Sequence, residues 1–239
     1  MKCLFLAAGY ATRLYPLTEN FPKPLLEVGD STILDRLIED LAPLVEEFVV
    51  ISNHKFASIF RDWAKGKPVV VLDDGTESNE TRLGAVRDIQ FAVEKLGITD
   101  DCLIMAGDNV LDFSLQGFVD FAREKGTSCV MCHPEFDPAK QRRTAIITVD
   151  GKGLITSYEE KPQRPKGDLA VPPFYFYRGA DLARVTEALA DGCNADAPGS
   201  FAAWLSGKVP VHAYVMPGHR YDIGDVESYQ AVRMVFGGT

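Results

Sequence analysis

The sequence predicts an α/β fold, a three-layer sandwich in which a mixed, mostly parallel sheet lies between helices. Short apolar runs alternate with amphipathic segments through the first half of the chain, as is typical of a doubly wound sheet. Two of the runs, Pro68–Leu72 and Cys102–Met105, are apolar without a break, like strands that are buried on both faces of a parallel sheet. A hydrophobic content of 46% in 239 residues is enough for a complete core.

Strands and helices are expected to alternate up to about residue 135. The predicted strands are residues 2–6, 48–52, 68–72, 102–105 and 128–132. The predicted helices are residues 33–41, 56–63, 80–95 and 114–125. Asp30 or Ser31 can cap the first helix, and Pro43 bends or ends it.

After about residue 140 the pattern becomes more mixed. Residues 144–149 and 154–158, joined by a turn at Gly151–Gly153, predict a β-hairpin. Strands at 174–177 and 209–215 and helices at 180–190, 199–206 and 226–236 are expected to follow. Because no low-complexity linker or repeat interrupts the chain, we expect a single domain over residues 1–239.

Charge and cysteine content exclude several classes of protein. With 25 basic and 34 acidic residues the net charge is −9, which disfavours a general surface for nucleic acid. The five cysteines are odd in number, and four lie in strand-like runs, so free thiols in a reducing cytoplasm are expected. Zinc is disfavoured because Cys129 and Cys132 have no second ligand pair nearby. No apolar run reaches 18 residues and no signal peptide is recognisable, so no membrane partner is expected.

A loop of small residues follows the first predicted strand. Ala7, Ala8 and Gly9 leave backbone N–H groups uncovered, as close approach of a polyanion requires. Arg13 and Lys23 add two cations, and the prolines on both sides of Lys23 restrict its backbone. The loop fits neither of the common glycine-rich nucleotide motifs. The segment nevertheless predicts a cradle for nucleotide phosphates at the edge of an α/β sheet.

Two aspartates lie next to a predicted strand or helix. Asp108 comes directly after the apolar strand that ends near Ala106, and ligands of open α/β sheets bind beyond the carboxyl ends of strands. Asp222 lies just before the last predicted helix. A carboxylate at such a place can hold Mg²⁺ between phosphates, since this ion takes few ligands from protein. Each aspartate could instead be a simple helix or turn cap.

Residues 6–18 read L-A-A-G-x-x-T-R-L-x-P-L-T, and residues 22–25 read P-K-P-L. This segment resembles the opening signature of the sugar-phosphate nucleotidyltransferases, the glucose-1-phosphate thymidylyltransferase-like NDP-sugar pyrophosphorylases. The resemblance implies a Rossmann-like nucleotidyltransferase fold over nearly the whole chain, with a nucleotide-binding half at 1–140 and an acceptor-facing half at 141–239. It also implies that the C-terminal β-helix of some members is absent. The implied enzyme joins an NTP and a sugar 1-phosphate to give an NDP-sugar and pyrophosphate.

The resemblance also implies roles for individual residues. Arg13 and Lys23 are the expected catalytic cations on the triphosphate, and Asp108 and Asp222 are the expected ligands of Mg²⁺. The residues expected to bind the nucleotide are Leu6, Ala7, Ala8, Gly9, Thr12, Arg13, Lys23, Asn79, Thr81, Gly84 and Asp108. The expected acceptor-binding residues are Glu160, Lys161 and Tyr175, with Lys161 on the acceptor phosphate and Glu160 on sugar hydroxyls. No general base is required, because a phosphomonoester with a second pKa of about 6 is mostly dianionic at neutral pH.

Two departures from the family leave the base and the acceptor open. Residues 74–85 lack the usual base-binding pattern, and Pro172 and Pro173 occupy the place of a glycine at the acceptor wall. The donor is therefore dTTP, CTP or UTP, and a homo-oligomer is left open. One alternative is a cytidylyltransferase for a choline- or aminoalkyl-type phosphate. Another is a non-catalytic regulator that binds sugar nucleotides.

Overall fold

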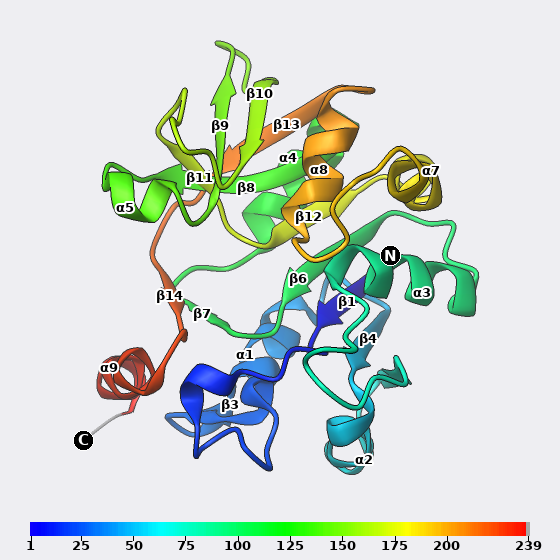
Figure 1. Cartoon of the computed structure of the whole chain (residues 1–239), viewed down its shortest axis with the longest axis vertical. Coiled ribbons are helices and arrows are strands. Elements are labelled where there is room, and N and C mark those ends of the chain that lie inside the picture. The colour runs from blue at the N-terminus through cyan, green and yellow to red at the C-terminus, as the bar shows by residue number, and fades with distance from the viewer. Residues whose placement is uncertain (238–239) are drawn as a thin grey trace. The chain divides into compact units, whose positions relative to one another are not determined.

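The structure, a computed structural model, describes residues 1–237 and places them in two units, which are described separately here (Figure 1). The first unit contains residues 1–83, residues 106–116 and the segment from Gly218 onward. The second contains residues 84–105 and 117–217. The mixed α/β class predicted from the sequence is confirmed. No helix in the described part of the chain is both long and apolar enough to span a bilayer.

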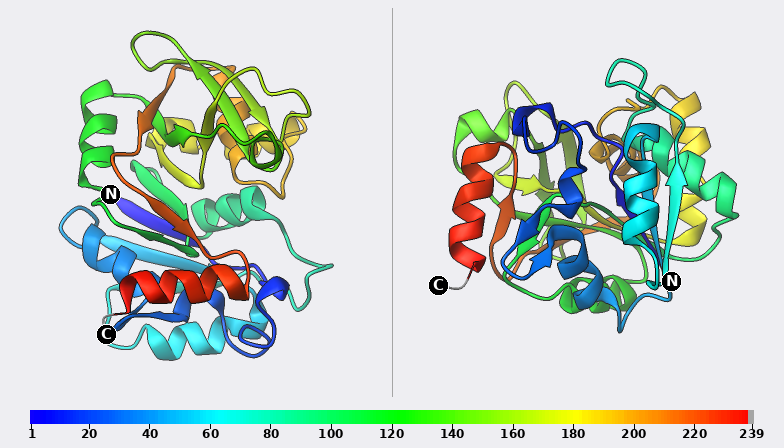
Figure 2. Two further views of the ribbon diagram at one scale, coloured as in Figure 1. Left: turned by 90° about the vertical axis from the view of Figure 1, so that its left-hand side faces the viewer. Right: turned by 90° about the horizontal axis from the view of Figure 1, so that it is seen from below.

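Three parallel strands form the sheet of the first unit. They are β1 (Lys2–Leu6), β4 (Glu47–Ser52) and β5 (Val69–Asp73), in spatial order β1-β4-β5. The connecting helices α1 (Ile33–Leu41) and α2 (His54–Trp63) lie on one face of this sheet (Figure 2). Both crossovers step in the same direction, and right-handed crossovers then bring both helices to the same side.

The N-terminal cap of α1 differs from the prediction by one or two residues. Thr32, and neither Asp30 nor Ser31, accepts the hydrogen bond from the Asp35 backbone N–H at 3.0 Å. The helix begins directly after a short antiparallel pair, β2 (Glu27–Val28) with β3 (Ser31–Thr32), so the last residue of this pair is also the cap.

A two-stranded ribbon that the sequence did not predict completes the first unit. Strand β7 (Asn109–Leu111) pairs antiparallel with β14 (Arg220–Asp222), and helix α9 (Val226–Phe236) follows (Figure 1). Val110 and the adjoining Ile223 are buried in one apolar cluster. Its other buried members are Leu14, Leu26, Val28, Ile33, Tyr229 and Val232.

The second unit is built on a mixed sheet in the order β10-β9-β11-β8-β12-β6, with β13 parallel to β8. Its strands are β6 (Cys102–Ala106), β8 (Ser128–Pro134), β9 (Ala145–Val149), β10 (Ile155–Glu160), β11 (Leu169–Val171), β12 (Phe174–Tyr177) and β13 (Val211–Val215). The predicted hairpin is confirmed as the antiparallel pair β9–β10. Strand β11 and the short helix α5 (Pro138–Gln141) were not predicted.

Two predicted helices of this unit were wrong in extent. The helix expected over 80–95 is α3 (Ala85–Leu96), because Gly84 has φ +93° and a side chain there would collide with the Ala195 carbonyl oxygen at 2.6 Å. The helix expected over 180–190 is divided into α6 (Gly179–Leu182) and α7 (Val185–Ala190), because Arg184 leaves the helical conformation. Helices α4 (Gln116–Lys125) and α8 (Gly199–Ser206) lie where they were expected.

All five cysteines are free, as predicted. Burial raises the pKa of the Cys129 thiol to about 11 and that of Cys132 to about 12. Both thiols therefore stay protonated at neutral pH and are poor metal ligands.

Candidate active site

The small-residue loop after β1 is fixed by hydrogen bonds to the backbone and to a side chain of the first unit. The Ala7 N–H donates to the Ile51 carbonyl at 2.9 Å, and the buried Asn53 amide donates to the Ala8 carbonyl at 3.0 Å. Gly9 is exposed, and a β-carbon placed there would meet no protein atom within 4 Å. The loop is thus fixed in place while the space above Gly9 is open to a ligand.

A single 3₁₀ turn at Thr12–Leu14 carries the first cation of the predicted site. Ala11 enters this turn in the left-handed conformation with φ 47°, and the Thr18 hydroxyl donates to the Ala11 carbonyl at 2.8 Å. Leu14 is buried and anchors the turn, so the side chains of Thr12 and Arg13 are exposed on its outer side.

Lys23 is fixed more firmly than a surface lysine. It begins a second 3₁₀ turn, Lys23–Leu25, and the side chain is only 11% exposed. Its ammonium forms an ion pair with Asp108 Oδ2 at 2.9 Å, although 85 residues separate the two in sequence. The sequence placed both residues at a phosphate and metal site, and the structure brings them into contact.

Asp222 reaches the same place through the β7–β14 ribbon. In the register of the ribbon Asp222 lies opposite Asn109, and the Ile223 N–H donates to the Asp108 carbonyl at 3.3 Å. Loss of water around the Asp222 carboxyl, and then the like charge of Asp108, raises its pKa above the ordinary value. The two predicted metal ligands are therefore close enough to repel each other.

Cations surround this pair of carboxylates. Arg220, Lys23 and Arg13 each oppose the upward shift of the Asp222 pKa. Two facing carboxylates fit a divalent cation that takes its remaining ligands from phosphates and water. Among residues 1–237 no group of three or more His, Cys, Asp or Glu side chains could hold a metal by protein ligands alone.

The residues predicted to contact the nucleoside lie in and after the exposed loop that follows β5. Thr81 is exposed, and its hydroxyl donates to the Ser78 carbonyl at 3.1 Å. Asn79 is exposed and accepts from Arg82 through its backbone carbonyl. Gly84 has a structural reason to be glycine, as described above. Their contacts with a nucleotide remain predictions.

In the second unit, the predicted acceptor residues gather around the start of α8. A β-carbon at Gly199 would lie 2.5 Å from Glu160 Oε2, 2.9 Å from the Tyr158 hydroxyl and 3.4 Å from the Tyr175 hydroxyl, so all three polar groups lie close to this position. Burial raises the pKa of Glu160, and the neighbouring charge of Lys161 opposes the shift. Glu160 and Tyr175 thus belong to one polar cluster, and Tyr158 is a member that the sequence reasoning missed.

Lys161 has an unusual backbone at the end of β10. Its φ of +48° is rare for a residue with a side chain, and its N–H donates to the Thr144 carbonyl at 3.1 Å. The side chain is exposed. Strained residues of this kind concentrate at functional sites, which is consistent with the predicted role of Lys161 on a phosphate.

Asn109 and Arg220 are two further residues that the sequence reasoning missed. Arg220 Nη1 donates to Asn109 Oδ1, and Asn109 Nδ2 donates to Asp108 Oδ1 at 2.6 Å. The sequence contained a signal for each residue. Asn109 directly follows Asp108, and Arg220 lies two positions before Asp222, a spacing that places both side chains on one face of a strand.

Comparison with known proteins identifies the family of the chain. A sequence model of the family described as Nucleotidyl transferase matches residues 2–236, so the chain belongs to the nucleotidyl transferase family. The UTP–glucose-1-phosphate uridylyltransferase AglF of Haloferax volcanii is 30% identical over 184 residues, which make up 75% of this chain and 73% of that protein. Mannose-1-phosphate guanylyltransferase 1 of Arabidopsis thaliana is 24% identical over 233 residues, 96% of this chain and 63% of that protein.

A solved structure supports the fold independently. The structure of a UDP-glucose pyrophosphorylase complexed with UDP-glucose matches with a TM-score of 0.82 at 20% identity, over 98% of this chain and 97% of that one. The Rossmann-like nucleotidyltransferase fold and the enzyme class, a nucleotidyltransferase, are thereby confirmed. The chain spans 38% to 73% of the length of the first curated relatives that it matches.

Proposed function

We propose that this protein joins an NTP to a sugar 1-phosphate, giving an NDP-sugar and pyrophosphate. The observation that carries this proposal is the convergence of Lys23, Asp108 and Asp222 in the first unit, which also contains the open loop at Gly9. The named substrates of its relatives support the choice of acceptor, because those proteins are uridylyl- and guanylyltransferases of hexose 1-phosphates.

In this proposal the first unit binds the triphosphate. The backbone N–H groups of the loop at 7–9 and the side chains of Arg13 and Lys23 neutralise the phosphates, and the open space above Gly9 admits them closely. Asn79 and Thr81 are the candidates for contacts with the base. The transfer needs alignment and charge stabilisation in place of a general base, since the attacking phosphate oxygen is already ionised.

Asp108 and Asp222 are the proposed ligands of Mg²⁺. When bound, the ion neutralises charge on the α-phosphate and on the departing pyrophosphate. The chain supplies two carboxylates whose mutual repulsion a cation relieves, and Lys23 already balances one of them in the structure.

The acceptor is assigned to the second unit. Lys161 is proposed to bind the phosphate of the sugar 1-phosphate, and Glu160 with the hydroxyls of Tyr158 and Tyr175 is proposed to bind the sugar. Residues 1–140 are proposed as the nucleotide part and residues 141–239 as the acceptor part of a single cytoplasmic domain. These parts differ from the two units, because the segment from Gly218 onward, with Asp222, belongs to the first unit and residues 117–140 belong to the second.

One observation favours a second candidate acceptor, an aminoalkyl or choline-type phosphate with CTP as donor. The same carboxylate among tyrosine hydroxyls that suits sugar hydroxyls also suits an ammonium group, through charge and aromatic faces. The flanking Pro172 and Pro173 narrow this wall of the second unit.

A pyrophosphate-release screen tests the proposal directly. The purified protein is incubated with Mg²⁺, each of ATP, CTP, GTP, UTP and dTTP, and a panel of hexose 1-phosphates, phosphocholine and phosphoethanolamine, with the Asp222→Asn variant as the inactive control. Release with a hexose 1-phosphate supports the first candidate, and release with CTP and an amine phosphate supports the second. No release above the control with any pair would refute the proposed activity and favour a non-catalytic binder.

A further inference from the structure

We propose that Arg220 and Asn109 are positioning residues that hold the carboxylates of Asp108 and Asp222 at the spacing a divalent cation requires. This inference rests on the proposed metal site and assigns a role to two residues outside its ligand set. The two side chains form a relay from one candidate ligand to the other, within the first unit.

The relay begins with the geometry of the β7–β14 ribbon. Asn109 and Asp222 are directly opposite, and Arg220 is diagonal to Asn109 on the same face, because it lies opposite Leu111. Long side chains can reach across such a diagonal of roughly 7–8 Å. Val110 and Tyr221 point to the other face, where they pack on the apolar cluster of the unit.

Two hydrogen bonds and one ion pair link the members of the relay. Arg220 Nη1 donates to Asn109 Oδ1 at 2.5 Å, and Asn109 Nδ2 donates to Asp108 Oδ1 at 2.6 Å. The same Arg220 nitrogen lies 3.7 Å from Asp222 Oδ1. Arg220 therefore contacts one carboxylate itself and reaches the other through a single amide.

The burial of Asn109 makes this arrangement specific. Its residue surface is only 1% exposed, so both ends of the amide must find partners inside the protein. With Arg220 as a donor that cannot accept, the amide oxygen must face Arg220 and the NH₂ must face Asp108. The amide thus fixes one oxygen of Asp108, and the other oxygen is left to Lys23.

One end of the ribbon is fixed independently of the relay. The Asp112 side chain accepts from the His219 N–H at 2.6 Å, and the Asp112 N–H donates to the His219 carbonyl at 3.2 Å. A β-carbon at Gly218 would lie 2.3 Å from Asp112 Oδ1, so the chain passes close to this carboxylate. Because these contacts secure the register, loss of the relay is expected to disturb the carboxylates more than the fold.

Charge alone predicts the opposite effect on metal binding. Arg220 is a cation beside the proposed ligands, and removing a cation would by electrostatics strengthen the binding of a divalent ion. A positioning role predicts weaker binding, since residues that orient metal ligands typically contribute about 10- to 100-fold in affinity. The sign of the change therefore distinguishes the two roles.

The test is a titration of the nucleotide-free protein with Mn²⁺, followed by the electron paramagnetic resonance signal of the free ion. Arg220→Gln and Asn109→Ala are each expected to weaken binding by about 10-fold or more. The double variant is expected to be within about 3-fold of the weaker single variant, because both act through one relay. Arg123→Gln, which removes the same charge from the exposed end of α4, is the matched control and should bind as the wild type does.

The outcomes separate this inference from the proposed function. Mn²⁺ binding by the wild type that Asp222→Asn abolishes supports the metal site, and unchanged or tighter binding by Arg220→Gln then overturns the positioning role alone. Absence of any Mn²⁺ binding by the wild type overturns a metal site formed by the two carboxylates without the nucleotide phosphates, and the relay with it. Thermal unfolding midpoints are measured for every variant. If Asn109→Ala does not fold, Arg220→Gln decides the question, because the Arg220 side chain is 20% exposed whereas Asn109 is buried.

Discussion

Replacement of Lys23 by methionine should separate catalysis from stability. Methionine keeps most of the aliphatic length of lysine and removes only the charge. In the structure the lost group is an ammonium 2.9 Å from Asp108, on a side chain that is 11% exposed. The variant therefore removes one ion pair and one proposed contact with the triphosphate.

The two effects differ in size. Asp108 is itself 34% exposed, so the ion pair is expected to contribute about 1–2 kcal/mol to the free energy of unfolding. For a chain of this length such a loss lowers the melting temperature by roughly 2–8 °C. Loss of a preorganised group that stabilises transition-state charge typically costs about 10²- to 10³-fold in turnover.

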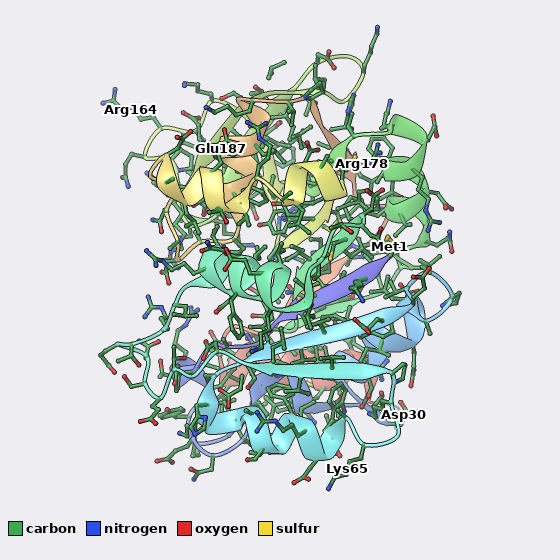
Figure 3. All side chains as sticks on the ribbon, turned by 90° about the vertical axis from the view of Figure 1, so that its right-hand side faces the viewer. Met1, Asp30, Lys65, Arg164, Arg178 and Glu187 are labelled. Atoms are coloured by element: carbon green, nitrogen blue, oxygen red, sulfur yellow. The ribbon has the colours of Figure 1, made fainter. Side chains whose placement is uncertain are left out.

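The assay is pyrophosphate release at 25 °C, where both proteins are folded, together with calorimetric melting. The matched control is Lys65→Met, because Lys65 also pairs with an aspartate, Asp62, but lies in the exposed turn that follows α2 (Figure 3). The control should keep the turnover of the wild type. Turnover of the Lys23 variant within about 3-fold of the wild type, well short of the expected loss, would refute the role of Lys23 in charge stabilisation.

Four further single variants and one double variant test other parts of the site. Asp108→Asn and Asp222→Asn should each abolish pyrophosphate release, and the double variant should be scarcely less active than either single variant. If the losses of activity multiply fully in the double variant, the two carboxylates act at separate sites. Lys161→Ala should raise the KM for the acceptor or lower kcat, with NTP affinity in a binding titration kept within a few-fold; lost NTP affinity would assign Lys161 to the other substrate. Asn53→Ala removes both the cap of α2 and the hydrogen bond to the Ala8 carbonyl. The free energy of unfolding should fall by about 2 kcal/mol, which lowers the melting temperature by roughly 4–8 °C. An unchanged melting temperature would contradict this prediction.

The fold was predictable wherever local pattern and burial agree. The strand at 2–6 and the helices at 199–206 and 226–236 have the predicted bounds, because apolar periodicity and flanking turn or capping residues coincide there. Predictions failed where a distant contact decides the local conformation. The start of α3 depends on Gly84 packing against the carbonyl of Ala195, and nothing within residues 80–95 indicates that contact.

Short strands that pair over long distances were also missed. The strands β7 (Asn109–Leu111) and β14 (Arg220–Asp222) have three residues each, which is too few for a periodic apolar pattern of their own. They form because Val110 and Tyr221 are covered by the same apolar cluster. Pairing of this kind is a tertiary decision, since an isolated two-stranded ribbon is marginal in water.

The sequence by itself determined the identity of the chemical groups and the class of the protein. The motif at residues 6–25, followed later in the sequence by Asp108, Lys161 and Asp222, was enough to predict a member of the nucleotidyl transferase family, which the family match confirms. The sequence shows directly which chemical groups are present, because each group is the side chain of one residue at one position.

Only the tertiary structure decided how those groups meet. It joined Lys23 to Asp108, set Asp222 opposite Asn109, and connected the two carboxylates through Arg220. These contacts link positions separated by 85 and 111 residues. Bringing such distant positions together costs chain entropy, which the burial of apolar side chains throughout the unit offsets. No local propensity specifies these contacts.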